Sequence, residues 1–304
     1  MMAWIANVTS VLVMPFLLAG VIQRVKSLWS GRKGPPLLQP AYDVLRLLRK
    51  SPVYSATATP IFQIAPWVFL ITAAGSAVIV PLLGSAPLAS FAFDFVWFAY
   101  VWALGRVAMV LAALDTGSSF EGMGSARELT FATLLEPVLF LVAAALCLRS
   151  GTHSLYHALV FDAGGAVLLR LCAVLALFIM LQVESARMPV DDPSTHLELT
   201  MVHEVMVLDH SGPDLAAIVF GSMLKLFVGA ALIATLLNPW AGQGTLLAAA
   251  VNLALSVLVA VSVGTVESLV ARIQLRLVPE YISLALGLGA VALLLGAWGA
   301  GAGP

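Results

Sequence analysis

The sequence is poor in charge. Lys, Arg, Asp and Glu make up 10% of its 304 residues, whereas apolar residues make up 61%. Soluble domains carry about a quarter charged residues, so this chain has too few to cover a surface that faces water. Lipid is therefore the predicted solvent for most of its surface.

The sequence also lacks the patterns of metal and nucleic-acid sites. Cys147 and Cys172 lie far apart in apolar runs, which excludes an iron–sulfur cluster or structural zinc held by this chain alone. Both are interpreted as small apolar fillers. The net charge is −1 and no basic run is long enough to indicate nucleic acid.

Histidines do not compensate for the missing cysteines. The run HEVMV has Val207 where an HExxH zinc site needs its second histidine. His196 and His203 are seven residues apart, about 10 Å along a helix, which is too far for one ion. No metal site is predicted.

Eight apolar runs are each long enough to cross the hydrocarbon core of a bilayer, which takes about 20 residues. We predict an all-α polytopic membrane protein with one membrane domain over residues 1–304. No internal repeat is visible, which disfavours a self-contained transporter built from two matching halves. The predicted spans cover residues 3–23, 61–83, 92–114, 129–148, 163–183, 215–237, 245–268 and 280–300.

Basic residues gather in alternate connections, residues 24–60, 115–128, 184–214 and 269–279, while the other three loops together hold one arginine. The positive-inside rule places these four loops in the cytoplasm and both termini on the outer side of the inner (cytoplasmic) membrane. Within the first loop, a proline in the first turn and a stripe of Tyr42, Leu45 and Leu48 predict an amphipathic interfacial helix.

Several ionisable residues lie inside the apolar runs, where a charge costs at least a few kcal/mol. They are expected to face the protein interior or water, and to pair. Pro137 follows Glu136 and leaves backbone groups that need other hydrogen-bond partners. This favours a functional role for Glu136 in a proton path. Buried ion pairs that fix helix register are the alternative interpretation.

The stretch ESARMPVDDPSTHLELTMVHE, residues 184–204, is the most charged. Pro189 and Pro193 prevent a continuous helix, and the pattern from Thr195 predicts a helix packed against the protein. Its apolar face and its histidine stripe are predicted to consist of Leu197, Met201 and Leu208, and of His196, His203 and His210.

The layout of spans and three motifs, SGRKGPPLLQPAYD, ARELTFATLLEP and the stretch 184–204, resemble the membrane subunit shared by complex I and the energy-converting nickel–iron hydrogenases. In complex I that subunit joins the redox arm to the antiporter-like arm and helps to form the quinone chamber. The resemblance covers nearly the whole chain. His196 stands where the quinone-reducing branch usually has an acid, so the sequence is more similar to the formate hydrogenlyase branch.

This resemblance, together with the buried charges, assigns candidate roles, none of them catalytic. The expected proton-coupling residues are Glu136, Glu184, Asp191, Asp192, His196, Glu198, His203, Glu204 and Glu267. The expected charge partners are Arg106, Arg127, Arg170, Arg187 and Lys225. The residues expected at a quinone-like cavity and at the partner docking surface are Arg32, Lys33, Gly34, Pro35, Gln39, Asp43, Glu121 and Glu128.

The function expected from the resemblance is that of a membrane-anchoring and proton-coupling subunit. It would link the cytoplasmic redox arm of a formate hydrogenlyase-like nickel–iron hydrogenase to ion translocation. The alternatives are a quinone-site subunit of a complex I-type enzyme and a purely structural anchor. No cofactor is expected in this chain, a quinone stays undecided, and the nickel–iron centre and iron–sulfur clusters are expected in partners. The expected partners are hydrogenase large and small subunits, antiporter-like membrane subunits and lipids, but no nucleic acid.

Overall fold

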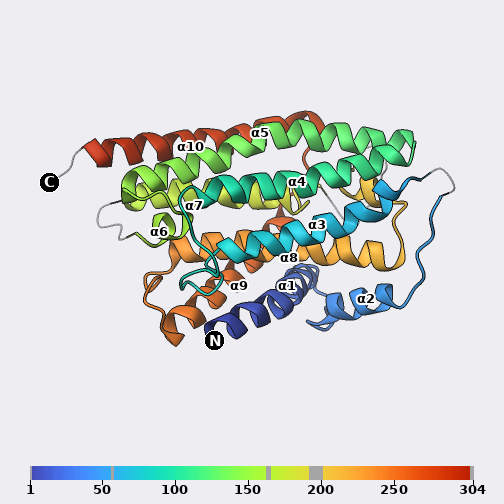
Figure 1. Cartoon of the computed structure of the whole chain (residues 1–304), viewed down its shortest axis with the longest axis horizontal. Coiled ribbons are helices and arrows are strands. Elements are labelled where there is room, and N and C mark those ends of the chain that lie inside the picture. The colour runs from blue at the N-terminus through green and yellow to red at the C-terminus, as the bar shows by residue number, and fades with distance from the viewer. Residues whose placement is uncertain (1, 56–57, 162–165, 192–200, 302–304) are drawn as a thin grey trace.

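The computed structural model describes residues 2–55, 58–161, 166–191 and 201–301, and these form helices and irregular connections with no strand (Figure 1). Three of the candidate proton-coupling residues, Asp192, His196 and Glu198, lie outside the described residues.

Eight helices in the described part of the chain are long and apolar enough to cross a membrane. They match the eight predicted runs and confirm an all-α polytopic membrane protein. They are α1 (Met2–Trp29), α3 (Pro60–Ile79), α4 (Asp94–Asp115), α5 (Ser119–Ser150), α7 (Val167–Glu184), α8 (Gly212–Leu237), α9 (Leu246–Leu269) and α10 (Val278–Gly301).

Two helical segments differ from the sequence expectation. α5 begins at Ser119, ten residues before the predicted span, because its first turns bury Glu121, Gly124 and Ser125 against the protein instead of forming a solvated loop. The short helix α6 (Leu155–Val160) was not predicted. It begins where the carboxylate of Asp94 accepts a 2.6 Å hydrogen bond from the Leu155 N–H, a long-range cap with no local sequence signal.

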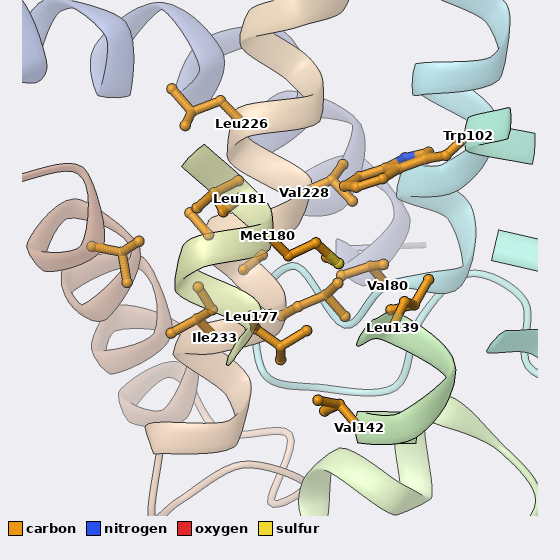
Figure 2. Packing of buried hydrophobic residues seen from close by; sticks show 14 of the residues in the cluster. Val80, Trp102, Leu139, Val142, Leu177, Met180, Leu181, Leu226, Val228 and Ile233 are labelled. Carbon is orange, nitrogen blue, oxygen red and sulfur yellow. The ribbon is translucent and has the colours of Figure 1, made fainter. Parts of the chain in front are cut away.

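Helix α8 is the centre of the bundle. It contacts α1, α2, α3, α7 and α9, and most of its residues are buried. In Figure 2, its Val228 and Ile233 lie beside Leu177 and Leu181 of α7, with Trp102 of α4 nearby. Because α8 is surrounded by other helices, a charged side chain on it faces protein and not lipid. Lys225 accordingly lies buried in the interior.

The first connection contains helix α2 (Gln39–Leu48), with a proline in its first turn. Val44 is buried while Tyr42, Leu45 and Leu48 are exposed, which confirms the predicted amphipathic helix. The segment that leads to α2 passes directly against α1. This close approach is possible because residue 20 is a glycine, since a Cβ there would overlap the Leu37 carbonyl.

The helix predicted from Thr195 is wrong over its described part. Residues 201–211 contain only the 3₁₀ turn η1 (Glu204–Val207). The carboxylate of Asp191 accepts hydrogen bonds from the N–H groups of Val202 (3.1 Å) and His203 (2.9 Å), and Val205 is fully buried. The bonds to Asp191 replace the backbone hydrogen bonds that a helix would make here. The segment is also buried, whereas a surface helix would keep one face in solvent.

Gly124 sets how closely η1 approaches α5. A Cβ on Gly124 would overlap the Val205 side chain and lie 2.9 Å from the Val202 carbonyl oxygen, whereas one on Gly122 would meet nothing within 4 Å. Gly124→Ala is expected to lower the free energy of unfolding by about 1–3 kcal/mol through overpacking. Gly122→Ala should raise it by up to about 1 kcal/mol through helix propensity. Thermal unfolding of both variants in one detergent measures the difference, and equal shifts would contradict the contact.

Candidate functional site

Five charged side chains from four helices form one connected group of ion pairs: Arg106 of α4, Glu128 and Glu136 of α5, Glu184 of α7 and Lys225 of α8. We call them the ion cluster. Arg106 donates from Nη1 to Glu136 (2.7 Å) and from Nη2 to Glu184, and its Nε lies 3.6 Å from Glu128. Lys225 donates to the second oxygen of Glu184 at 2.8 Å.

Arg106 is the centre of the ion cluster. Its planar fork presents several N–H groups in fixed directions, which suits a cation that binds more than one carboxylate. The side chains of Arg106, Glu184 and Lys225 are each only 6% exposed, so their charges are stable only because they are paired. Three carboxylates face two cations, and uptake of one proton would therefore make the ion cluster neutral.

Lys225 is also held by aromatic rings. Its ammonium nitrogen lies 4.9 Å from the ring centroid of Trp102 and 5.4 Å from that of Phe69. Both distances allow cation–π attraction, which strengthens where water is excluded. Sequence reasoning missed both aromatics, because an aromatic residue at an interior position of a span has the same pattern as ordinary core.

Two cavities lead toward the ion cluster from the connection between α7 and α8. A cavity of about 210 Å³ is lined in part by Gln23, Arg187, His203 and Glu204. A second cavity of about 10 Å³, roughly the room that one water needs, is lined by His203 together with four members of the ion cluster. His203 thus borders both cavities, between the charged connection and the buried carboxylates.

Two further groups of charges fasten the connection to the bundle. The fully buried carboxylate of Glu267 lies 3.1 Å from Lys26 and 3.6 Å from Arg187. Asp191, which binds the backbone at 202–203, also pairs with Arg272 at 3.1 Å. The pair of Arg187 and Glu267 therefore joins the 184–214 connection to α9. The pair of Asp191 and Arg272 joins the same connection to the loop after α9.

Two predicted charge partners, Arg127 and Arg170, donate to backbone carbonyls. Arg127 donates to the Met201 carbonyl at 2.8 Å and so helps to hold the segment before η1. Arg170 donates to the Phe161 carbonyl at 2.6 Å and lies over the Phe161 ring. It sits near the start of α7, whereas Glu184 is the last residue of that helix.

The residues grouped at a quinone-like cavity do not form one site. Gln39 donates to Asp43 within α2, Arg32 and Lys33 are exposed, and Gly34 and Pro35 are half-buried in the preceding turn. Glu128 belongs to the ion cluster. Glu121 is buried and accepts a hydrogen bond from the Asp209 N–H at 3.3 Å.

Sequence reasoning missed the contacts of two titratable residues, His210 and Asp214, near the start of α8. Asp214 accepts hydrogen bonds from Tyr54 (2.8 Å) and Trp67 (3.1 Å). The nearby ring of His210 is 4% exposed and stacks on Phe62 at 4.0 Å between centroids. Burial lowers the pKa of His210 to about 4, although Asp214 and Asp209 oppose the shift. The partners of Asp214 lie 160 and 147 positions away in sequence, so no local pattern could reveal them.

A family model described as NADH dehydrogenase matches residues 2–297. The chain belongs to the NADH dehydrogenase family. This confirms the resemblance inferred from the three motifs, and together with the eight apolar helices it shows an integral membrane protein.

Three relatives show the breadth of the NADH dehydrogenase family. Hydrogenase-4 component C of Escherichia coli (strain K12) is 29% identical over 238 residues, 78% of this chain and 75% of that protein. Formate hydrogenlyase subunit 4 of the same strain is 27% identical over 278 residues, 87% and 88% of the two chains. A subunit of the NADH-quinone oxidoreductase of Rubrobacter xylanophilus (strain DSM 9941 / JCM 11954 / NBRC 16129 / PRD-1) is 26% identical over 216 residues, 69% and 64%.

A solved structure has the same fold. A chain of the membrane-bound sulfane sulfur reductase, an archaeal respiratory membrane complex, aligns with a TM-score of 0.78 over 98% of both chains at 19% identity. At that identity the similarity concerns fold alone. The eight-helix arrangement of this NADH dehydrogenase family member is therefore also found in a respiratory complex.

Proposed function

We propose that this chain is the proton-coupling and membrane-anchoring subunit of a multi-subunit, formate hydrogenlyase-like nickel–iron hydrogenase. The observation that carries the proposal is the ion cluster, in which two cations and three carboxylates pair between apolar membrane-spanning helices. The two Escherichia coli relatives from hydrogenase-4 and formate hydrogenlyase support the choice of complex. The nickel–iron centre and the iron–sulfur clusters belong, in this proposal, to partner subunits.

Coupling begins at the charged connection between α7 and α8. Electron transfer in a docked cytoplasmic partner changes the charge near this connection, and a buried carboxylate responds by changing its proton affinity. A proton enters through the 210 Å³ cavity, and His203, which borders both cavities, relays it to the ion cluster. The aromatic rings around Lys225 help to hold its ammonium group beside Glu184.

Glu136 is the exit from the ion cluster. It lies in the middle of α5, binds Arg106, and has 43% of its side chain exposed on the surface of this chain. Lipid does not accept a carboxylate at that depth, so the exposure supports a neighbouring membrane subunit on this face. An antiporter-like subunit with polar groups there would continue the proton path, and hydrogenase subunits would dock on the charged connections.

Substitution of Glu136 tests the coupling role. Glu136→Gln should leave assembly and electron transfer by the complex intact but lower membrane-potential formation in inverted vesicles at least about tenfold, since positioned acids contribute about 10²–10⁴ to proton transfer. The exposed acid Glu280 at the start of α10 provides the control, Glu280→Gln. Full membrane potential in Glu136→Gln would exclude the proton role and favour a purely structural anchor.

A quinone-site subunit is the second candidate. It is favoured by the 210 Å³ cavity, whose mixed lining of Gln23, Arg187 and His203 offers hydrogen bonds to a quinone headgroup, and by the relative from an NADH-quinone oxidoreductase. Inhibitor-sensitive quinone binding to the purified complex, lost in Arg187→Leu, would favour this function over the hydrogenase one.

A further inference from the structure

An apolar groove of about 340 Å³ lies between α1, α2, α3 and α8, separate from the two cavities that lead to the ion cluster. Its lining is apolar throughout and includes Leu12, Phe16, Leu45, Leu48, Trp67 and Phe220. The rings of Phe16 and Phe220 stack at 5.1 Å and join α1 to α8. Leu12, Leu45 and Leu48 are each about half exposed, so the groove opens to the surroundings of the protein.

Cations gather at one end of this groove. The groove-lining residues of α2 are Ala41, Val44, Leu45 and Leu48, and the helix ends directly before the exposed residues Arg49 and Lys50. The Lys50 carbonyl lies where a Cβ on Gly212 would approach it to 3.0 Å. The cationic end of α2 therefore lies at the start of α8, on the side of the charged connections.

The surrounding segment strengthens this polarity. Residues 24–50 contain seven Lys or Arg and a single acid, Asp43, which pairs with Arg46 at 3.3 Å. Arg49 and Lys50 form no ion pair with the residues that the structure describes. An apolar groove that ends in such cations is complementary to an amphiphile with an anionic headgroup.

We propose that the groove binds an acyl chain of an anionic phospholipid, whose phosphate pairs with Arg49 and Lys50. Arg and Lys near a membrane surface attract anionic lipid, and a stripe of apolar residues on α2 keeps the chain in the groove. The lipid fills the space between α2 and the three spans, and so fixes the position of the first connection. This site is independent of the proton path.

Fluorescence of Trp67 in the intact, purified complex tests the site. Phosphatidylglycerol with brominated acyl chains, titrated into phosphatidylcholine nanodiscs, should quench Trp67 at a lower mole fraction than brominated phosphatidylcholine does. The difference between wild type and Trp67→Phe isolates the signal of this residue. Arg49→Gln should weaken quenching about fivefold, because each surface cation contributes on the order of 1 kcal/mol. Arg276→Gln, an exposed cation on η2 (Leu275–Leu277), should leave it unchanged.

A second variant probes the groove itself. Ala217 lies in the lining and is buried, so Ala217→Phe should fill the groove and abolish quenching of Trp67. If that variant fails to assemble, Arg49→Gln, at an exposed position, still decides the question. Equal quenching by the two lipids, no quenching by either, or equal affinity of Arg49→Gln and wild type for phosphatidylglycerol would each overturn the proposal.

Discussion

Replacing Arg106 with leucine is expected to lower the free energy of unfolding by about 3–5 kcal/mol, because it leaves two carboxylates of the apolar helix α5 without their cation. Glu184 retains Lys225, but Glu128 and Glu136 lose the ion pairs with Arg106. Thermal unfolding in detergent and the amount of assembled complex in membranes measure the loss.

Two comparisons make the Arg106 prediction specific. Arg149→Leu removes another helix arginine, one that donates to the Gly299 carbonyl at 2.9 Å, and should cost no more than about 2 kcal/mol because only a neutral acceptor is left. Adding Glu128→Gln to Arg106→Leu should recover part of the lost stability, since one carboxylate left without a cation is removed while Glu184 and Lys225 stay paired. If the two arginine variants were equally stable, the ion cluster would not be held together by its charges.

Acid is expected to destabilise the protein through His210, whose pKa is about 4 in the fold against an ordinary value of 6.5. Above pH 6.5 the ring is neutral in both states and contributes nothing. Between the two values the unfolded chain binds a proton that the folded chain does not, so stability falls as pH falls. The expected loss from this residue is about 2–3 kcal/mol by about pH 4.5.

Comparison with His210→Phe isolates that contribution from those of the carboxylates. Phenylalanine keeps the stack on Phe62 and removes two ring nitrogens that have no hydrogen-bond partner among the residues that the structure describes. The stability advantage of His210→Phe should therefore grow by about 2–3 kcal/mol between neutral pH and about pH 4.5. His157→Phe, at an exposed position, controls for the loss of a histidine. A constant difference across this pH range would contradict the burial of His210.

The spans could be predicted from sequence because the physics of a span is local. About 20 apolar residues suffice to satisfy the bilayer and the backbone together, so α3, α4 and α9 follow the predicted runs to within a few residues. The charged residues inside those runs were equally visible. The free-energy cost of a charge in lipid predicts that Arg106, Glu184 and Lys225 face the protein interior or water. In the structure, Glu184 binds both Arg106 and Lys225.

The partners within the ion cluster and the geometry of the 184–214 connection could not be derived in the same way. Arg106 and Glu184 are 78 positions apart, and which helix faces which depends on packing around α8. The helix expected from Thr195 fitted a local period, but Asp191 binds the backbone at residues 202–203 and η1 is buried against α5. Tertiary contacts there override a pattern that was correct only for an isolated surface helix.

The exposed carboxylate of Glu136 also bears on biogenesis. A copy of this chain synthesised without its neighbours would present an acid to lipid in the middle of α5, at a cost of at least a few kcal/mol. In the complex proposed above, a neighbouring membrane subunit would cover this carboxylate, whereas the chain alone would leave it exposed. Proton conduction and control of stoichiometry in the complex would then depend on the same side chain.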